Sequence, residues 1–161
     1  MAHVVRCGLI QLANPINDES VPVAEIQQAM LEKHLPYIDE AGEKGVQILC
    51  LQEIFNGPYF CPSQSTRWYE AAEPIPGPTT EIMAEYARKH EMVIVVPLYE
   101  EAMRGVYYNS AAVIDADLSR AAAAIALSTA ACARGGHPRV PTPHAERVRC
   151  FAEMDPTDAA W

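Results

Sequence analysis

Lysine is scarce in this chain and unevenly placed. Only three lysines occur among 161 residues, and none lies beyond Lys89. Lysine and arginine together number 12 against 21 acidic residues, so the net charge is −9, and no basic cluster occurs. A protein of this charge is repelled by nucleic acid and by anionic membrane surfaces. We therefore expect neither kind of partner.

The chain also lacks the usual signals of metal binding, export and membrane insertion. Its five cysteines form no CxxC pair, and no histidine or cysteine pair has the spacing of zinc ligands. We find no basic-then-apolar signal peptide and no apolar run long enough to cross a bilayer. These absences predict a cytoplasmic protein without disulfides, metal or membrane spans. Cys7 and Cys50, inside apolar segments, are expected to be inert core thiols.

The first 117 residues alternate between apolar runs and helical patterns. Four strands are predicted at 4–12, 46–52, 92–97 and 106–115, and two helical stretches at 22–42 and 80–90. Pro36 should kink the first helix or divide it in two. The order of elements and the nearly continuous apolar strands predict an α/β fold, in which helices cover a mixed sheet.

Residues 118–161 have a different composition. Alanine fills 12 of these 44 positions, lysine is missing, and the net charge is +1 against −10 for residues 1–117. No run alternates as a strand would, and Ala121–Ala133 has helix propensity without an apolar stripe. We expect this tail to be poorly ordered or loosely packed, and to be separate from a domain at residues 4–117.

Glu53 stands at the end of the apolar run Val46-Gln-Ile-Leu-Cys-Leu-Gln-Glu53. A carboxylate where a buried strand emerges costs free energy unless it is paired or solvated. Sheet-based enzymes present an acid or base at this place, but a solvated or salt-bridged strand end explains the residue equally well. Two other acids, Glu100 and Glu101, are expected to form a solvated pair in a turn. His34 and His90 are expected to be surface or packing residues.

Several strings around Glu53 resemble one family. They are Ile48-Leu-Cys-Leu-Gln-Glu-Ile-Phe55, Gly57-Pro-Tyr-Phe-Cys61, Pro76-Gly-Pro-Thr-Thr-Glu81 and Tyr108-Asn-Ser-Ala-Ala-Val-Ile-Asp-Ala-Asp117. In this order they resemble the nitrilase superfamily of carbon–nitrogen hydrolases over residues 4–117. Within it the chain is most similar to the N-carbamoyl amidohydrolases, the group that includes β-ureidopropionase.

The resemblance implies a fold, a mechanism and a substrate class. The fold would be an α-β-β-α sandwich, of which this chain has the N-terminal half, and the intact domain would form a homo-oligomer through helices. A glutamate, a lysine and a cysteine would hydrolyse a small amide or ureido substrate without a cofactor. Glu53 matches the glutamate, which takes a proton from the cysteine thiol and later from water.

Three further residues are candidates for the substrate pocket. Tyr59 and Phe60 would line it, as the loop after the glutamate does in the family, or they would instead cap the core beneath a long loop. Asn109 would support the site by bonding to Glu53 or to nearby backbone, or it would be an ordinary buried amide with its hydrogen bonds satisfied.

The chain departs from the family beyond Asp117. Leu118-Ser-Arg replaces the strand that carries the family's lysine, and this lysine has no counterpart. Cys150 and, less closely, Cys132 echo the context of the nucleophile, but the strand and glycine before it are missing. The alternatives to an active hydrolase are a catalytically inactive truncated fragment and a non-catalytic oligomerising module that associates through its sheet.

A shift of reading frame would account for the tail. The segment Leu127-Ser-Thr-Ala130 can be encoded as CTA AGT ACC GCN. Reading from the last base of the leucine codon gives AAG TAC CGC, which is Lys-Tyr-Arg, a string typical of the family's lysine strand. The hypothesis is tested by resequencing the DNA across codons 115–135, where an intact frame would reject it.

Overall fold

A four-stranded mixed sheet forms the centre of the molecule. The structure is a computed structural model, and it describes residues 4–63 and 65–116. The strands are β1 (Cys7–Ile10), β2 (Ile48–Leu51), β3 (Val93–Met103) and β4 (Val106–Ile114), in the spatial order β1-β2-β3-β4. β1, β2 and β3 are parallel, and β4 runs antiparallel to β3. The predicted α/β fold with a mixed sheet is confirmed.

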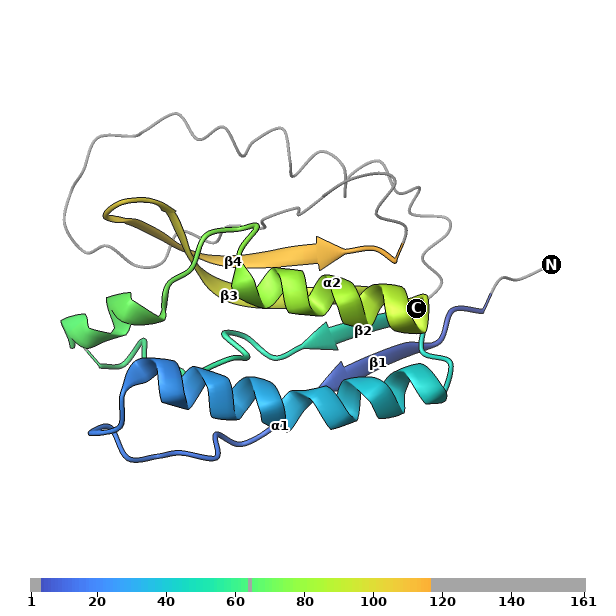
Figure 1. Ribbon diagram of the computed structural model, residues 1–161, viewed down its shortest axis with the longest axis horizontal. Helices are drawn as coiled ribbons and strands as arrows, with labels where there is room; N and C mark the ends of the chain where they lie inside the picture. The colour runs from blue at the N-terminus through green and yellow to red at the C-terminus, as the bar shows by residue number, and fades with distance from the viewer. Residues whose placement is uncertain (1–3, 64, 117–161) are drawn as a thin grey trace.

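Two long helices lie on the same face of this sheet (Figure 1). Helix α1 (Val23–Glu43) connects β1 to β2, and helix α2 (Pro78–His90) connects β2 to β3. Such helical crossovers are what parallel strands require. Proline at the first position of α2 and three basic residues in its last turn, Arg88, Lys89 and His90, suit the ends of that helix.

The core fills the layer between helices and sheet. Side chains from all four strands, such as Leu49, Ile94 and Ala112, are buried there against Ile38 of α1 and Met83 of α2. These strand residues alternate with less buried ones, as expected where only one face of a sheet is covered. His34 is also fully buried, and its ring meets that of Phe55 edge-on at 5.1 Å.

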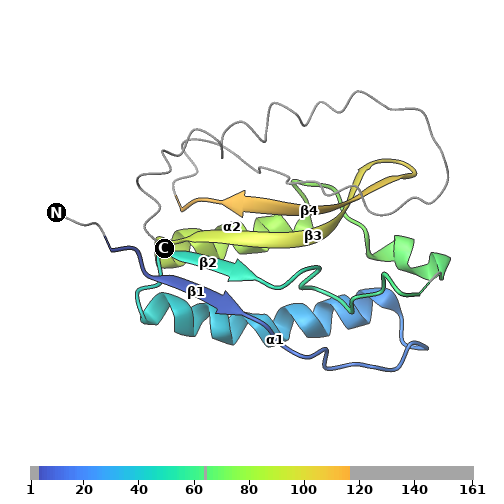
Figure 2. The ribbon, with the colours of Figure 1, turned by 180° about the vertical axis from the view of Figure 1, so that it is seen from behind.

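The opposite face of the sheet carries no helix among residues 4–63 and 65–116 (Figure 2). We call it the open face, and define it by side chains that lie in register across the strands: Cys7, Leu9, Ile48, Cys50, Val95 and Val113. Leu9 is 84% exposed and Ile48 39% exposed. Cys7 is exposed and Cys50 half-buried, so the expectation of two core thiols is wrong for Cys7, because its side chain points away from the helices.

Several predicted bounds differ from the structure. The first strand, predicted at 4–12, spans only Cys7–Ile10. α1 is not divided, because it continues through Pro36, whose ring lies on the exposed side of the helix. The third strand does not end at Pro97 but extends to Met103, where it forms a hairpin with β4. Pairing with β4 supplies backbone hydrogen bonds that a local sequence pattern does not reveal.

Candidate active site

Glu53 lies two residues beyond the carboxyl end of β2, and its side chain is exposed. The neighbouring Gln52 joins this end of β2 to the segment after β1, because its Oε1 accepts the backbone N–H of Leu12 at 2.5 Å. The next residue, Ile54, is buried and has a φ of 48°. A β-branched residue rarely adopts this left-handed conformation, so the chain bends sharply where the carboxylate is presented.

Asn109 holds the Glu53 carboxylate. Its Nδ2 donates a hydrogen bond to Glu53 Oε1, which joins the end of β2 to the middle of β4. Residues 109, 111 and 113 share one side of β4, while Ser110, Ala112 and Ile114 are buried on the helix side. The Glu53–Asn109 pair therefore lies at the rim of the open face. The predicted bond between these two residues is present, and any role in substrate binding stays a prediction.

Tyr59 lies near Glu53 as well, on the loop that follows β2. Its side chain is 57% exposed. Interaction with the Cys61 side chain raises the pKa of the Tyr59 hydroxyl, and the negative charge of Glu53 adds to this rise. These effects indicate that the Tyr59 phenol lies near the Glu53 carboxylate and beside the exposed thiol of Cys61. The sequence showed Cys61 in the family-like loop, but nothing in the pattern indicated this proximity.

Phe60 is half-buried in an aromatic cluster under the same loop. Its ring stacks on Trp68 at 5.6 Å and meets Tyr99 edge-on at 5.0 Å. Tyr99 in turn stacks on Tyr107 at 5.5 Å. Burial raises the pKa of Tyr99 to about 12, so its hydroxyl stays protonated. Of the two predicted roles for Phe60, packing beneath the loop agrees with these contacts.

Glu100 is not part of a solvated turn, and that expectation is wrong. It belongs to β3 and is 6% exposed, because its side chain points to the helix side, where Ser110 Oγ donates to its Oε2 at 2.5 Å. Glu73 lies beside it in a parallel bridge and accepts the backbone N–H of Thr79 at 3.1 Å. Burial raises the pKa of Glu73, and the Thr79 hydrogen bond opposes that rise.

The three lysines of the chain are all engaged away from Glu53. Lys33 Nζ donates to the carbonyl oxygen of Ala13 at 2.5 Å, Lys44 pairs with Glu40, and Lys89 Nζ lies 2.6 Å from Asp39 Oδ1. Cys132 and Cys150 lie outside the described residues. Within the described ranges, no group of three or more histidine, cysteine or acidic side chains could hold a metal ion.

A profile of one protein family, Carbon-nitrogen hydrolase, matches residues 6–133. The chain belongs to the carbon–nitrogen hydrolase family. The Arabidopsis thaliana β-ureidopropionase is 40% identical over 116 residues, and N-carbamoylputrescine amidase from Solanum lycopersicum is 44% identical over 78. These matches cover 70% and 48% of this chain, but only 28% and 26% of the relatives. The chain thus spans less than a third of their length.

A solved structure shares the fold of this carbon–nitrogen hydrolase chain. The crystal structure of a carbon–nitrogen hydrolase from Helicobacter pylori G27 superposes with a TM-score of 0.60 at 23% identity. The superposition covers 72% of this chain and 37% of the other. Among the described residues, no helix is both long and apolar enough to span a membrane.

Proposed function

We propose that this chain provides the glutamate-bearing part of an enzyme that hydrolyses a carbon–nitrogen bond outside peptides, with an N-carbamoyl (ureido) compound as substrate. One observation carries the proposal. The Glu53 carboxylate is presented beyond the carboxyl end of β2 and is hydrogen-bonded by Asn109 from β4. The identities with the plant β-ureidopropionase and N-carbamoylputrescine amidase support the substrate class.

The chemistry suits these residue types. A carbamoyl carbon is a poor electrophile, so a thiolate attacks it more readily than water does. Glu53 takes the proton from the thiol, the sulfur bonds to the carbamoyl carbon, and the carbon–nitrogen bond breaks as Glu53 passes this proton to the leaving nitrogen, which departs as ammonia. Water then gives a proton to Glu53 and bonds to the carbon, the carbon–sulfur bond breaks, and Glu53 returns the proton to the sulfur. The reaction needs no cofactor. Cys150 only echoes the context of the family's nucleophile, because the strand and glycine before it are missing, so of the three catalytic residues this chain retains the glutamate alone.

Tyr59 and Asn109 would act around this base. The Tyr59 hydroxyl stays protonated, because its pKa is raised, so it can donate a hydrogen bond to the substrate. Asn109 uses Nδ2 to orient the carboxylate. A cation that stabilises the oxyanion is not supplied by Lys33, Lys44 or Lys89 in their observed contacts. Turnover by this chain alone would therefore be slow.

A second candidate function is a non-catalytic oligomerising module, or equally an inactive fragment of the hydrolase. The observation that favours the module is the open face, where Leu9 and Ile48 are exposed. Exposed apolar patches of this kind mark interaction surfaces. We place the protein in the cytoplasm and propose self-association in either case.

The decisive experiment measures ammonia released by the purified full chain from N-carbamoyl-β-alanine and N-carbamoylputrescine. Replacing Glu53 with glutamine keeps the side chain's size and removes the base, so activity should fall roughly 10²–10⁴-fold. Glu85, an exposed acid on α2, serves as the matched control when changed to glutamine. A soluble oligomer with no turnover would favour the module. Turnover that survives Glu53→Gln would reject the proposed base.

A further inference from the structure

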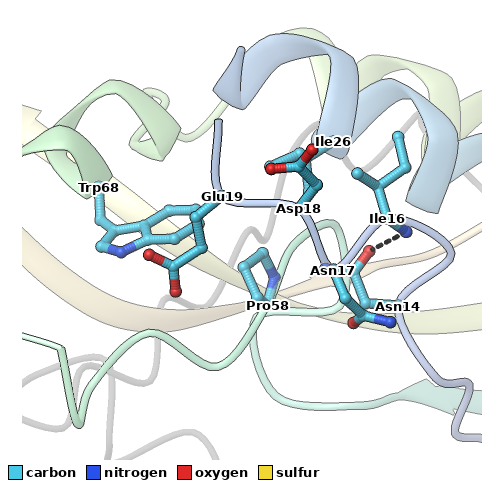
Figure 3. Close-up of a pocket in the computed structure, with 8 residues that line it drawn as sticks. All are labelled: Asn14, Ile16, Asn17, Asp18, Glu19, Ile26, Pro58 and Trp68. Carbon is cyan, nitrogen blue, oxygen red and sulfur yellow. Dashed lines mark hydrogen bonds between the residues drawn. The ribbon is translucent and has the colours of Figure 1, made fainter. Parts of the chain in front are cut away.

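The short 3₁₀ helix η1 (Thr66–Ala71) and the residues after it are tied to the molecule at both ends. At the η1 end, Arg67 Nη2 donates to the carbonyl oxygen of Val21 at 2.6 Å. Trp68 of η1 also lines a small pocket together with residues of the loop after β1 (Figure 3). At the other end, the segment 72–77, which we call the strap, runs from η1 to the start of α2 and pairs with β3 on the way.

Glu73 is the residue through which the strap is attached. Its backbone N–H donates to the Tyr99 carbonyl oxygen at 3.1 Å, and its own carbonyl oxygen accepts the N–H of Glu101 at 2.9 Å. Glu73 and Glu100 are therefore partners in a parallel bridge, and their side chains point to the same side, toward the helices. There Glu73 Oε2 accepts the backbone N–H of Thr79, in the first turn of α2, at 3.1 Å. One residue thus joins the strap to both β3 and α2.

The second oxygen of the Glu73 carboxyl is buried without a partner. Glu73 Oε1 is closed off from solvent and has no hydrogen-bond partner among the described residues. An ionised carboxylate carries negative charge on both oxygens, so ionisation would leave a charged acceptor unsatisfied in the interior, which costs free energy. No ion pair within the described part of the chain includes Glu73. A neutral carboxyl fits these surroundings better than a carboxylate does.

The titratable groups on the neighbouring elements do not offset a negative charge at Glu73. Glu100 lies across the bridge on β3, Tyr108 lies opposite Glu100 on β4, and Glu81 is an exposed acid in the first turn of α2. None of these is a cation. The N-terminus of α2 and the Thr79 hydrogen bond favour the carboxylate, but burial is the larger effect, so the pKa of Glu73 is raised above its ordinary value of 4.5.

We propose that Glu73 is a pH-sensitive latch, which holds the strap to β3 and α2 while its carboxyl is protonated and releases the strap when the carboxyl ionises. The protonated group still accepts the Thr79 N–H through its carbonyl oxygen, and it brings no charge into the interior. The stability that the latch contributes is therefore complete below the unfolded pKa and is lost as the pH rises through the folded pKa. Tyr99, to which Glu73 is bonded, pairs in register with Asn109, so the strap is attached directly opposite the residue that holds Glu53.

Amide hydrogen exchange of the full chain, followed by NMR and corrected for the intrinsic rate, tests the latch locally. The N–H groups of Glu73 and Glu101 make the two bonds between the strap and β3. Their protection should fall at least about threefold as the pH rises from about 5 to about 8. The N–H of Val93 bonds to the Gln47 carbonyl oxygen at 2.8 Å, away from the strap, and should keep its protection.

Two variants separate the latch from a general effect of pH. Glu73→Gln keeps the size of the side chain and is neutral at every pH, so both strap amides should stay protected throughout. Glu81→Gln removes an exposed acid at the same end of α2 and should retain the wild-type fall in protection. Constant protection in the wild type, or a fall that persists in Glu73→Gln, would overturn the proposal.

A direct titration keeps the test valid if Glu73→Gln fails to fold. The ¹³C shift of the Glu73 carboxyl carbon in the wild-type chain reports its protonation. We expect its midpoint above the ordinary value of 4.5, and a midpoint at or below that value would overturn the latch. None of these measurements depends on turnover, so their failure leaves the proposed hydrolase untouched.

Discussion

Ile54 stores backbone strain directly beside Glu53. Its φ of 48° costs a β-branched residue about 1–3 kcal/mol. The surroundings hold it there, since its side chain is buried with Trp68 and Tyr99 and the N–H of Phe55 bonds to the Pro97 carbonyl oxygen at 3.3 Å. Strain of this kind is tolerated where it positions a functional group. Here it turns the chain so that Glu53 meets Asn109.

Asp39 links the two helices, and this link gives a prediction about pH. Its Oδ1 lies 2.6 Å from Lys89 Nζ and 2.6 Å from His90 Nε2. Hydrogen bonds from Lys89, and then from His90, lower the pKa of the Asp39 carboxyl below 3.8. The pair is partly solvated, so we expect Asp39→Asn to reduce the free energy of unfolding by roughly 0.5–1 kcal/mol at pH 7.

The sign of the pH dependence follows from the lowered pKa. A carboxyl with a lower pKa in the folded state stabilises the fold above its unfolded pKa, and this contribution is lost as the pH falls. Urea unfolding of wild type and Asp39→Asn should therefore differ at neutral pH and converge below the ordinary value of 3.8. Glu85→Gln, on an exposed site, is the control. A difference that persists in acid would show that Asp39 acts through packing.

At the scale of elements, helix and strand order could be predicted from sequence, but strand ends could not. The apolar periods locate both helices and the four strands of the sheet. The sequence pattern does not predict that Glu100 is buried in a strand. A buried carboxyl is tolerated there because Ser110 on β4 donates a hydrogen bond to it. Of the two outcomes predicted at Pro36, division of the helix does not occur, because tertiary packing of Ile38 and His34 outweighs the lost hydrogen bond.

Replacing Pro36 and measuring the free energy of unfolding tests how much this proline costs the helix. Proline in a helix interior is about 3 kcal/mol less favourable than alanine, although it also restricts the unfolded chain. We expect Pro36→Ala to raise the free energy of unfolding by about 1–3 kcal/mol, measured by urea denaturation followed by circular dichroism. Pro15→Ala, in the exposed loop after β1, should instead lower it by about 0.4–1 kcal/mol. Destabilisation by Pro36→Ala would mean that its ring makes needed contacts.

Some parts of the candidate site could be predicted from the sequence, and others depend on how the whole molecule folds. Glu53 and Asn109 could be paired in advance, because both residues belong to the strings that resemble the family. The Tyr59–Cys61 contact and the unpaired indole of Trp68 could not, because they depend on how loops fold over the sheet. Glu53 lies at the rim of the open face and Leu9 lies on it. Both are exposed for the same reason, because no helix covers this face among the described residues. Whatever covers this face also changes the surroundings of Glu53.

The open face should make the chain self-associate. Leu9 lies in register with Cys50, Val95 and Val113, which forms an apolar row across all four strands. Burying one leucine side chain contributes about 1.5–3 kcal/mol, so Leu9→Ser should weaken association at least about tenfold. Because Leu9 is exposed in the single chain, its replacement should leave folding intact. Sedimentation velocity across a concentration series measures the effect.

Met103 provides the control for this prediction. It is 66% exposed, like Leu9, but it lies at the end of β3 in the hairpin, outside the open face. Met103→Ser removes a comparable apolar side chain, so it should leave association unchanged if the face itself is the contact. Equal weakening by both variants would indicate non-specific apolar aggregation. A monomeric wild-type chain at all concentrations would reject the oligomerising module and leave the hydrolase as the better account.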